Sequence, residues 1–357
     1  MWPTQLSGSS PARAWSNRGL RSRMPAILGI AALLAGASIG SWLSIRGGQP
    51  AKPALYGTGR PTPATLWTWD GNAYTSRPVP STGPSSNAAD MAYDRSRGLI
   101  VLWDHGCASM VMGFQGGCIA QVNRTWTWDG RTWTAHQTQT NPTAAGPGAM
   151  LFDGRLGRVV YVNGAGKAWT WGGYDWAALP LPGGPNIPVP GSATDSSSFA
   201  VGYDERRDLL VFAIFGATWS WNGSRWTEIA SGIDPADARP DAHLVYDNAH
   251  QQLVYVGSHD TWTWDGTRWQ QHLQPAIAAG TMVYDRVRAT ILLVQPDSSD
   301  CDRTACGTTT WTWDSAAWTR IPMVGGPLLP LTRSGGSALP LAFDEALGVT
   351  VMFASAS

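Results

Sequence analysis

The chain has 357 residues, a formal net charge of zero and only 14% charged residues. Such a composition excludes a disordered polyampholyte and a wholly basic nucleic-acid-binding protein. The 41 glycines and 25 prolines are too many for a helical bundle, and the 21 tryptophans indicate an aromatic, turn-rich β protein.

Residues 1–62 predict export from the cytoplasm. Residues 1–23 form a basic tail with four arginines and no acid, and residues 24–45 form an apolar run of 22 residues without a charge. Such a run spans a bilayer as one transmembrane helix, and the positive-inside rule keeps the tail in the cytoplasm. Residues 46–62 are rich in proline and glycine, as in a linker. We therefore expect a single-pass protein of the cell membrane, with its N-terminus cytoplasmic and residues 63–357 extracytoplasmic.

A cleaved signal peptide is the alternative for the same apolar run. The stretch Ala35-Gly36-Ala37 matches an A-x-A cleavage site. Cleavage near Ala37 would secrete the rest of the chain, so both interpretations export it.

The overall neutrality hides an asymmetry of charge. Residues 1–62 hold 7 basic residues and no acid, which leaves 18 basic against 25 acidic residues, a net charge of −7, in the exported part. We therefore expect no nucleic acid among its partners and contact with the membrane through the N-terminal helix alone.

Most tryptophans belong to a phrase W-x-W, which occurs six times and is usually followed by Asp-Gly or Asn-Gly. The first tryptophans are Trp67, Trp126, Trp169, Trp219, Trp262 and Trp311; the second are Trp69, Trp128, Trp171, Trp221, Trp264 and Trp313; a third aromatic residue follows at Tyr74, Trp133, Trp176, Trp226, Trp269 and Trp318. Asp-Gly between apolar runs predicts a β-hairpin. Trp133 faces Trp126 across a two-residue turn or Trp128 across a four-residue loop, and both registers put the three rings on one face. We interpret these tryptophans as structural residues that pack one repeat on the next.

A second phrase, an aromatic-Asp pair before a β-branched run, also occurs six times. The pairs are Tyr93-Asp94, Phe152-Asp153, Tyr203-Asp204, Tyr246-Asp247, Tyr284-Asp285 and Phe343-Asp344. The Asp side chain is suited to capping the turn that follows it. Each unit therefore contains four strands, which we call a (ending in the aromatic-Asp pair), b (the β-branched run), c (W-x-W) and d (the third aromatic).

Six such units predict an all-β fold, a six-bladed β-propeller of four-stranded antiparallel blades over residues 63–357. Five blades are expected at 91–135, 148–178, 199–229, 242–272 and 279–320. The sixth joins strands a and b of residues 338–354 to strands c and d of residues 65–76, which closes the ring.

These motifs resemble those of kelch-type propellers, similar to the central domain of galactose oxidase, in exported bacterial proteins. The resemblance covers residues 64–357, although the family's double glycine after strand b is replaced, for example by Val256-Gly257-Ser258. It implies an interaction module, since only a minority of kelch propellers are enzymes.

Four cysteines fall in two b–c connections. Export favours two local disulfides, Cys107–Cys118 and Cys301–Cys306. Asp297, Asp300 and Asp302 surround the second pair and are candidate calcium ligands, the alternative being a solvated acidic loop.

No catalytic constellation and no cofactor motif is recognisable. The b–c and d–a connections share one face of the ring and are long and variable, so we expect binding residues there or at the mouth of the central channel. Asp104, His105 and Arg303 are the candidates on this binding face. The expected partner is a protein or a cell-surface glycan; the alternative is a hydrolase or oxidase that uses the propeller as a scaffold, with its site at the channel mouth.

Overall fold

The computed structural model describes residues 64–354 except 81, 85–87, 111–117, 146–147, 186–198, 215, 232, 234–243, 274–276, 278–279, 302–304, 323–324 and 331–338, and except the side chains of 107–110, 118–121, 298, 305 and 330. All described residues lie in one compact unit, Thr58–Ser357.

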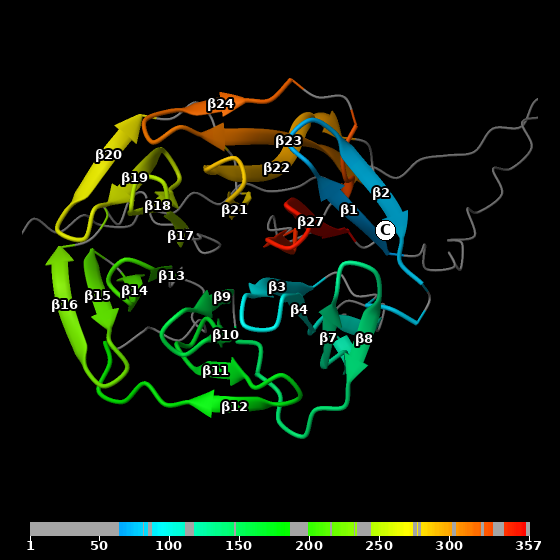
Figure 1. Cartoon of the computed structure of the whole chain (residues 1–357), viewed down its shortest axis with the longest axis horizontal. Helices are drawn as coiled ribbons and strands as arrows, with labels where there is room; N and C mark the ends of the chain where they lie inside the picture. Colours follow the sequence, from blue (N-terminus) through cyan, green and yellow to red (C-terminus); the bar gives the residue numbers. More distant parts are fainter. Residues whose placement is uncertain are drawn as a thin grey trace, which may run out of the picture. The chain divides into compact units, whose positions relative to one another are not determined.

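Six antiparallel sheets, five of four strands and one of four strands plus a short fifth, lie around a central axis, as in a β-propeller (Figure 1). Blade 1 contains β3 (Ala89–Asp94), β4 (Leu99–Asp104), β7 (Arg124–Trp128) and β8 (Trp133–His136). Blade 2 contains β9 (Ala149–Asp153), β10 (Arg158–Val162), β11 (Ala168–Trp171) and β12 (Trp176–Leu179). Blade 3 contains β13 (Phe199–Asp204), β14 (Leu209–Ile214), β15 (Ala217–Trp221) and β16 (Trp226–Ser231).

Blade 4 contains β17 (Leu244–Asp247), β18 (Gln252–Val256), β19 (Asp260–Trp264) and β20 (Trp269–Leu273). Blade 5 contains β21 (Thr281–Asp285), β22 (Thr290–Cys301), β23 (Ala305–Trp313) and β24 (Trp318–Arg320), with β25 (Leu329–Pro330) paired to β23. Strand a is innermost and strand d outermost in each blade. The predicted propeller of six four-stranded blades is confirmed.

Blade 6 combines two segments that are far apart in the sequence. It contains β26 (Leu341–Asp344) and β27 (Val349–Ala354) inside, and β1 (Thr65–Trp69) and β2 (Tyr74–Pro78) outside. β1 and β27 pair from Thr65 opposite Ala354 to Trp69 opposite Thr350. Both ends of the described chain therefore lie on the side of the ring that carries the b–c and d–a connections. We call this side the loop face, and the side with the a–b and c–d turns the turn face.

The W-x-W hairpins adopt the register of a four-residue loop. Trp128 lies opposite Trp133, and the same pairing recurs in the other blades. In blade 1, Gly130 has φ +92° and Asp129 accepts the backbone N–H groups of Arg131 and Thr132 at 2.8 and 2.7 Å. Only the glycine of this turn is left-handed, so the two-residue turn, which needs two such residues, does not form.

The Asp of each aromatic-Asp pair is buried and caps the a–b turn. In blade 1, Asp94 accepts a backbone N–H of its own turn and, through Oδ2, Nη1 of Arg97 at 2.7 Å. Arg97 also donates to the carbonyl oxygen of Gly172, in the c–d turn of blade 2, at 2.7 Å. Arg207 links Asp204 of blade 3 to the c–d turn of blade 4 in the same way. The cap therefore also joins neighbouring blades.

Blade 6 lacks this arginine. Asp344 is buried and accepts the backbone N–H groups of Ala346 and Leu347 at 3.0 Å each, but Leu347 occupies the arginine position and packs beside Gly130 of blade 1. Burial raises the pKa of Asp344, and the two backbone hydrogen bonds offset only part of that effect.

At four of the six seams between blades, the third aromatic residue joins the outer parts of the two sheets. Its ring donor reaches the threonine that precedes the W-x-W of the previous blade. The pairs are Trp176 Nε1 to Thr125 Oγ1 at 2.8 Å, Trp269 Nε1 to Thr218 Oγ1 at 2.7 Å, Trp318 Nε1 to Thr261 Oγ1 at 2.8 Å, and Tyr74 Oη with Thr310 Oγ1 at 2.7 Å. Leu66 replaces the threonine in blade 6, and Trp133 Nε1 has no partner among the described residues.

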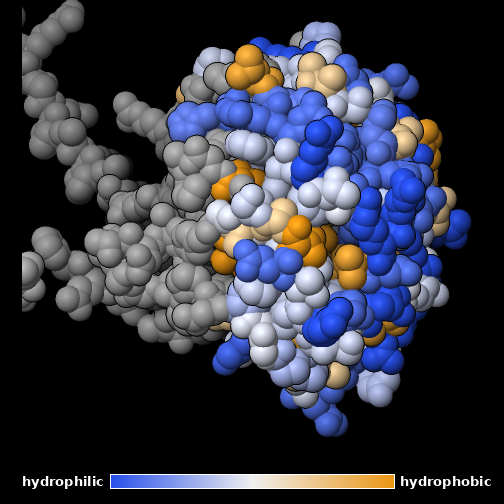
Figure 2. Space-filling view, turned by 90° about the vertical axis from the view of Figure 1, so that its left-hand side faces the viewer, coloured by the Kyte–Doolittle hydropathy of each residue, from blue (hydrophilic) through white to orange (hydrophobic). Residues whose placement is uncertain are grey.

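The outer strands present a polar surface. Figure 2 shows the side of the propeller that carries β16 and β20, where hydrophilic residues dominate and hydrophobic ones are scattered. Three residues of each strand are exposed, two of them adjacent in the sequence, as expected of edge strands.

Candidate functional site

Four charged side chains meet across the axis of the ring at the turn face. Arg95, Glu205, Arg286 and Glu345 each follow directly after the buried Asp of blades 1, 3, 5 and 6. Arg95 donates to Glu205 at 2.7 Å and to Glu345 at 2.6 Å. Arg286 contacts the same two carboxylates, and its Nε lies 2.8 Å from Glu345 Oε1. These residues form a closed square of alternating charge, which we call the charge quartet.

The charge quartet and the inner strands line a cavity of about 180 Å³. Its apolar wall includes Met91, Met150, Met282, Leu244 and Leu341, one from each of five inner strands. The aromatic residues of the six aromatic-Asp pairs also line it. The cavity therefore has an apolar wall and one strongly polar end.

The tyrosine hydroxyls around this cavity are engaged with neighbouring blades. Tyr203 Oη accepts the backbone N–H of Arg155 at 2.8 Å, and Tyr284 Oη accepts that of Ala249 at 3.0 Å. Burial raises the pKa of Tyr203 and of Tyr284, so both hydroxyls stay protonated. They hold the blades together rather than offering a free acid.

The arginines keep the carboxylate of Glu205 ionised. Burial opposes the ionisation of Glu205, but the hydrogen bonds and charges of Arg95 and Arg286 outweigh it and lower the pKa of this carboxyl. A general acid needs a raised pKa near the working pH. The geometry therefore suits the binding of a charged or dipolar group better than acid–base catalysis.

The sequence contains a signal for this site that the analysis of motifs missed. The position after the aromatic-Asp pair reads Arg95, Gly154, Glu205, Asn248, Arg286 and Glu345 around the ring. Charges of both signs in one column of a repeat, next to the axis, predict ion pairs across the channel. Asn248 joins the charge quartet by donating to Glu205 Oε2 at 3.2 Å.

On the loop face, the predicted binding residues of blade 1 lie near the inner strand. His105 Nε2 lies 2.9 Å from Asp90 Oδ2 of β3, and its ring stacks on Trp103 with centroids 4.3 Å apart. Trp103 Nε1 in turn donates to Asn123 Oδ1 at 2.8 Å. Asp104 is buried at the end of β4. The local packing thus fixes the side chain of His105, and the binding role of Asp104 and His105 stays a prediction.

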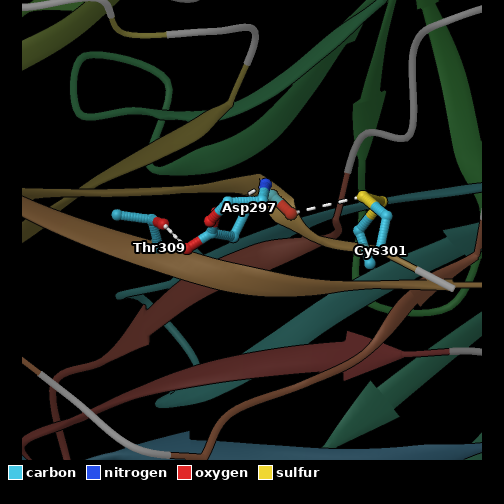
Figure 3. Close-up of a disulfide and its surroundings, with 5 residues drawn as sticks. Asp297, Cys301 and Thr309 are labelled. Atoms are coloured by element: carbon cyan, nitrogen blue, oxygen red, sulfur yellow. Dashed lines mark hydrogen bonds between the residues drawn. A yellow bond between two sulfur atoms is a disulfide. The ribbon is translucent and has the colours of Figure 1, made fainter.

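The long hairpin of blade 5 carries the second group of predicted residues (Figure 3). Cys301 and Cys306 form the expected disulfide, which is confirmed. Asp297 Oδ2 accepts a hydrogen bond from Thr309 Oγ1 at 2.9 Å and lies 3.0 Å from Arg320 Nη2. The hydrogen bonds of Ser299 contribute most to lowering the pKa of Asp297, and the contacts with Thr309 and Arg320 lower it further.

The calcium hypothesis is not supported further by this geometry. Asp297 is already engaged, Asp300 is exposed, and Asp302 and Arg303 lie outside the described residues. No group of three or more His, Cys, Asp or Glu side chains suited to a metal ion occurs in the part of the chain that is described.

Two further predictions fall on residues that the structure does not describe. Cys107 and Cys118 belong to β5 (Cys107–Met110) and β6 (Cys118–Gln121), which pair as a separate hairpin, but their side chains lie outside the description. The apolar run 24–45 is likewise outside it, and no helix formed by the described residues is long and apolar enough to cross a membrane.

The six sheets around one axis and the cavity between their inner strands define the chain as a six-bladed β-propeller. No family model and no curated protein matches it. Among solved structures it is similar to YjhT, with a TM-score of 0.47 and 10% identity over 72% of this chain and 92% of that one. It is also similar to the SapL1 lectin in complex with alpha methyl fucoside, with a TM-score of 0.43 and 15% identity over 74% of this chain and 97% of that one. A structural genomics protein of unknown function from Bacteroides thetaiotaomicron has a TM-score of 0.46 and 12% identity, over 82% of this chain and 76% of that one.

Proposed function

We propose that the chain is an extracytoplasmic interaction module of the kelch type, anchored in the cell membrane by residues 24–45, which binds a partner protein through the loop face of blades 5, 6 and 1. The main support is the uneven distribution of additional structure around the ring. The b–c connections of blades 2, 3 and 4 are short, the longest joining Val162 to Ala168. Blade 1 instead inserts the hairpin β5–β6, and blade 5 extends β22 and β23 and adds β25.

These additions flank blade 6, the one blade without a b–c connection, since its strands b and c are β27 and β1. Structured insertions on a rigid scaffold are typical of binding surfaces. The disulfide Cys301–Cys306 restrains one insertion, which lowers the conformational entropy lost on binding. The turn face lacks such insertions, and its side chains bond mainly to one another.

A protein suits this surface better than a glycan. Tyr174 is the one aromatic residue among the strongly exposed large hydrophobic side chains of the described residues. It belongs to the c–d turn of blade 2, on the turn face. The described part of the loop face therefore offers no strongly exposed aromatic side chain on which a sugar ring could stack.

Site-specific photo-crosslinking in the native cell envelope tests the proposed face. A photoreactive residue replaces Ser299 in blade 5 or Asn123 in blade 1, both exposed on the loop face, and replaces exposed Asn72 on the turn face as the control. The proposal expects the same crosslinked protein from Ser299 and Asn123 and none from Asn72. Crosslinks from Asn72 alone, or none from either loop-face position, would overturn it.

The anchor is tested separately on the full chain. An anchored protein stays in the membrane pellet after alkaline extraction and retains residues 1–45 by mass spectrometry. A soluble chain that begins near Ser38 would show cleavage instead and replace the anchor with secretion.

A further inference from the structure

We infer that the central cavity is a binding site for a small apolar α-amino acid in its zwitterionic form. This inference goes beyond the proposed partner-binding face, because the cavity lies at the axis on the turn-face side and shares no residue with the insertions of blades 1 and 5.

The cavity has the size of a small organic molecule. Its volume of about 180 Å³ would hold roughly six water molecules at ~30 Å³ each. Met91, Met282, Leu244 and Leu341 of its wall are all at least nine-tenths buried. An apolar group that enters there is removed from water almost completely, which favours its binding.

The charge quartet keeps hydrogen-bonding capacity after its own contacts are made. Arg95 and Arg286 each use Nε and Nη2 on the two glutamates, and no bond within the described residues uses their Nη1 groups. Both arginines contact Oε1 of Glu345, and Oε2 of Glu345 has no partner among those residues. Two guanidinium donors and one carboxylate oxygen thus remain for a ligand at the polar end of the cavity.

This remaining set matches a zwitterion. A carboxylate can accept hydrogen bonds from the two Nη1 groups, and an ammonium can donate to Oε2 of Glu345. The charge quartet is neutral as a whole, so a ligand of zero net charge leaves that balance unchanged. An anion or a cation alone would place an uncompensated charge in a half-buried site.

The wall indicates which side chains such an amino acid carries. Three of its residues, Met91, Met150 and Met282, are flexible and polarisable and adapt to apolar groups of different shape. Branched and thioether side chains of the size of leucine or methionine fit this environment. Glycine, which has no side chain to bury, is expected to bind at least about tenfold more weakly.

Solvent reaches the site from the turn face. The side chains of the charge quartet are between 22% and 31% exposed, whereas Met91, Met282, Leu244 and Leu341 behind them are buried. An amino acid can therefore exchange through the charge quartet without separation of the blades.

Isothermal titration calorimetry on the purified full chain tests the inference. The probes are L-leucine and L-methionine, with isocaproate lacking the amine, isopentylamine lacking the carboxylate, and glycine lacking the side chain. Saturable binding of leucine and methionine at millimolar or lower concentration is expected, at least about tenfold tighter than each analogue. Absence of heat with both amino acids, or equal binding of isocaproate, would overturn the inference.

Three variants locate the site. Glu345→Gln removes the acceptor charge and should weaken leucine binding by about tenfold or more, without weakening isocaproate in proportion. Met150→Phe fills the wall without changing a charge and should abolish leucine binding. Glu228→Gln, on the exposed face of β16, is the matched control and should bind as the unmodified chain does. Unchanged affinity in a folded Met150→Phe variant would place the ligand elsewhere and refute the assignment.

Discussion

Trp176 Nε1 donates to Thr125 Oγ1 at 2.8 Å, and this buried hydrogen bond crosses the seam between blade 2 and blade 1. Both residues belong to the repeated W-x-W phrase, the threonine as the residue before it and the tryptophan as its third aromatic. The phrase therefore specifies the hairpin inside one blade and also its attachment to the next.

Replacing Thr125 with Val should destabilise the propeller. The substitution keeps the shape of the side chain but leaves Trp176 Nε1 buried without an acceptor, at a cost of about 1–3 kcal/mol. Trp176→Phe removes the donor, so the double variant should lose less than the sum of the single losses. Chemical denaturation measures the effect, and Thr134→Val at an exposed position of β8 is the control. Additive losses in the cycle would show that the two residues act independently.

Leu347→Arg should stabilise blade 6 at pH values at which the carboxyl group of Asp344 is ionised. It would supply the partner that Arg97, Arg207 and Arg288 supply to the equivalent aspartates at 2.7–2.8 Å. Because the folded-state pKa of Asp344 is raised, the charged carboxylate destabilises the native state as pH rises, and an arginine would reverse this by about 1 kcal/mol or more. Thermal unfolding at neutral pH, repeated near pH ~3, measures the gain, which should vanish in acid.

Val287→Arg is the control for this gain, because Asp285 of that turn already has Arg288. An equal gain in both variants, or no gain at neutral pH, would contradict the role assigned to Asp344.

We expect the free energy of unfolding to fall in mild acid because of two partly buried histidines. His136 Nε2 lies 2.8 Å from Thr127 Oγ1, and His272 Nε2 lies 3.0 Å from Thr263 Oγ1. Burial lowers the pKa of both histidines. The unfolded chain then binds protons first as pH falls, so the free energy of unfolding should fall between about pH 7.5 and about pH 5.5.

Measuring the free energy of unfolding against pH in the double variant His136→Gln/His272→Gln gives the contribution of the two histidines to this loss. The slope should flatten in this variant. An equal slope in the double variant would assign the acid sensitivity to other groups.

Deleting residues 64–78 should destabilise the whole ring rather than one blade. Blade 6 would keep β26 and β27 and lose β1, β2 and the bond of Tyr74 with Thr310. Since domains are stable by only about 5–15 kcal/mol, loss of half a blade should abolish cooperative unfolding. Differential scanning calorimetry measures this, with deletion of residues 47–57, before the ring, as the control. A single transition at an unchanged temperature would show that β1 and β2 contribute little to closure.

Removing the disulfide should loosen one insertion and leave the ring intact. The bridge Cys301–Cys306 closes a short loop, which corresponds to about 2 kcal/mol of local restraint. In Cys301→Ser/Cys306→Ser, hydrogen exchange should accelerate in residues 295–309, while inner strands such as β21 and β26 exchange as before. Faster exchange throughout blade 5 would show that the bridge supports the blade itself.

Much of the fold could be predicted because its determinants are local. Asp94 and its equivalents cap turns a few residues away, and the spacing from Trp128 to Trp133 allowed only two hairpin registers. The choice between those registers depends on the turn conformation at Asp129-Gly130, which the pair of residue types alone does not specify.

The cavity was harder to predict because its polar end depends on partners far apart in the chain. Arg95 and Glu205 are separated by 110 residues and meet only because the ring brings blades 1 and 3 to one axis. Aligning the six repeats position by position reveals the charges, but it does not show how far each side chain extends across the channel. The predicted emphasis on the loop face therefore left the axial site unassigned.

The pairing of β1 with β27 also bears on the order of folding. β1 and β2 are the first strands of the ring to be synthesised, and β27 is the last, so the β1–β2 hairpin emerges long before its partner strand exists. Until then Tyr74 of the same hairpin is the aromatic neighbour of the two tryptophans of β1, and β1 offers one open edge to any other strand. Ring closure thus waits for the final residues of β27, which makes the nascent chain most prone to mispairing just before β27 is synthesised.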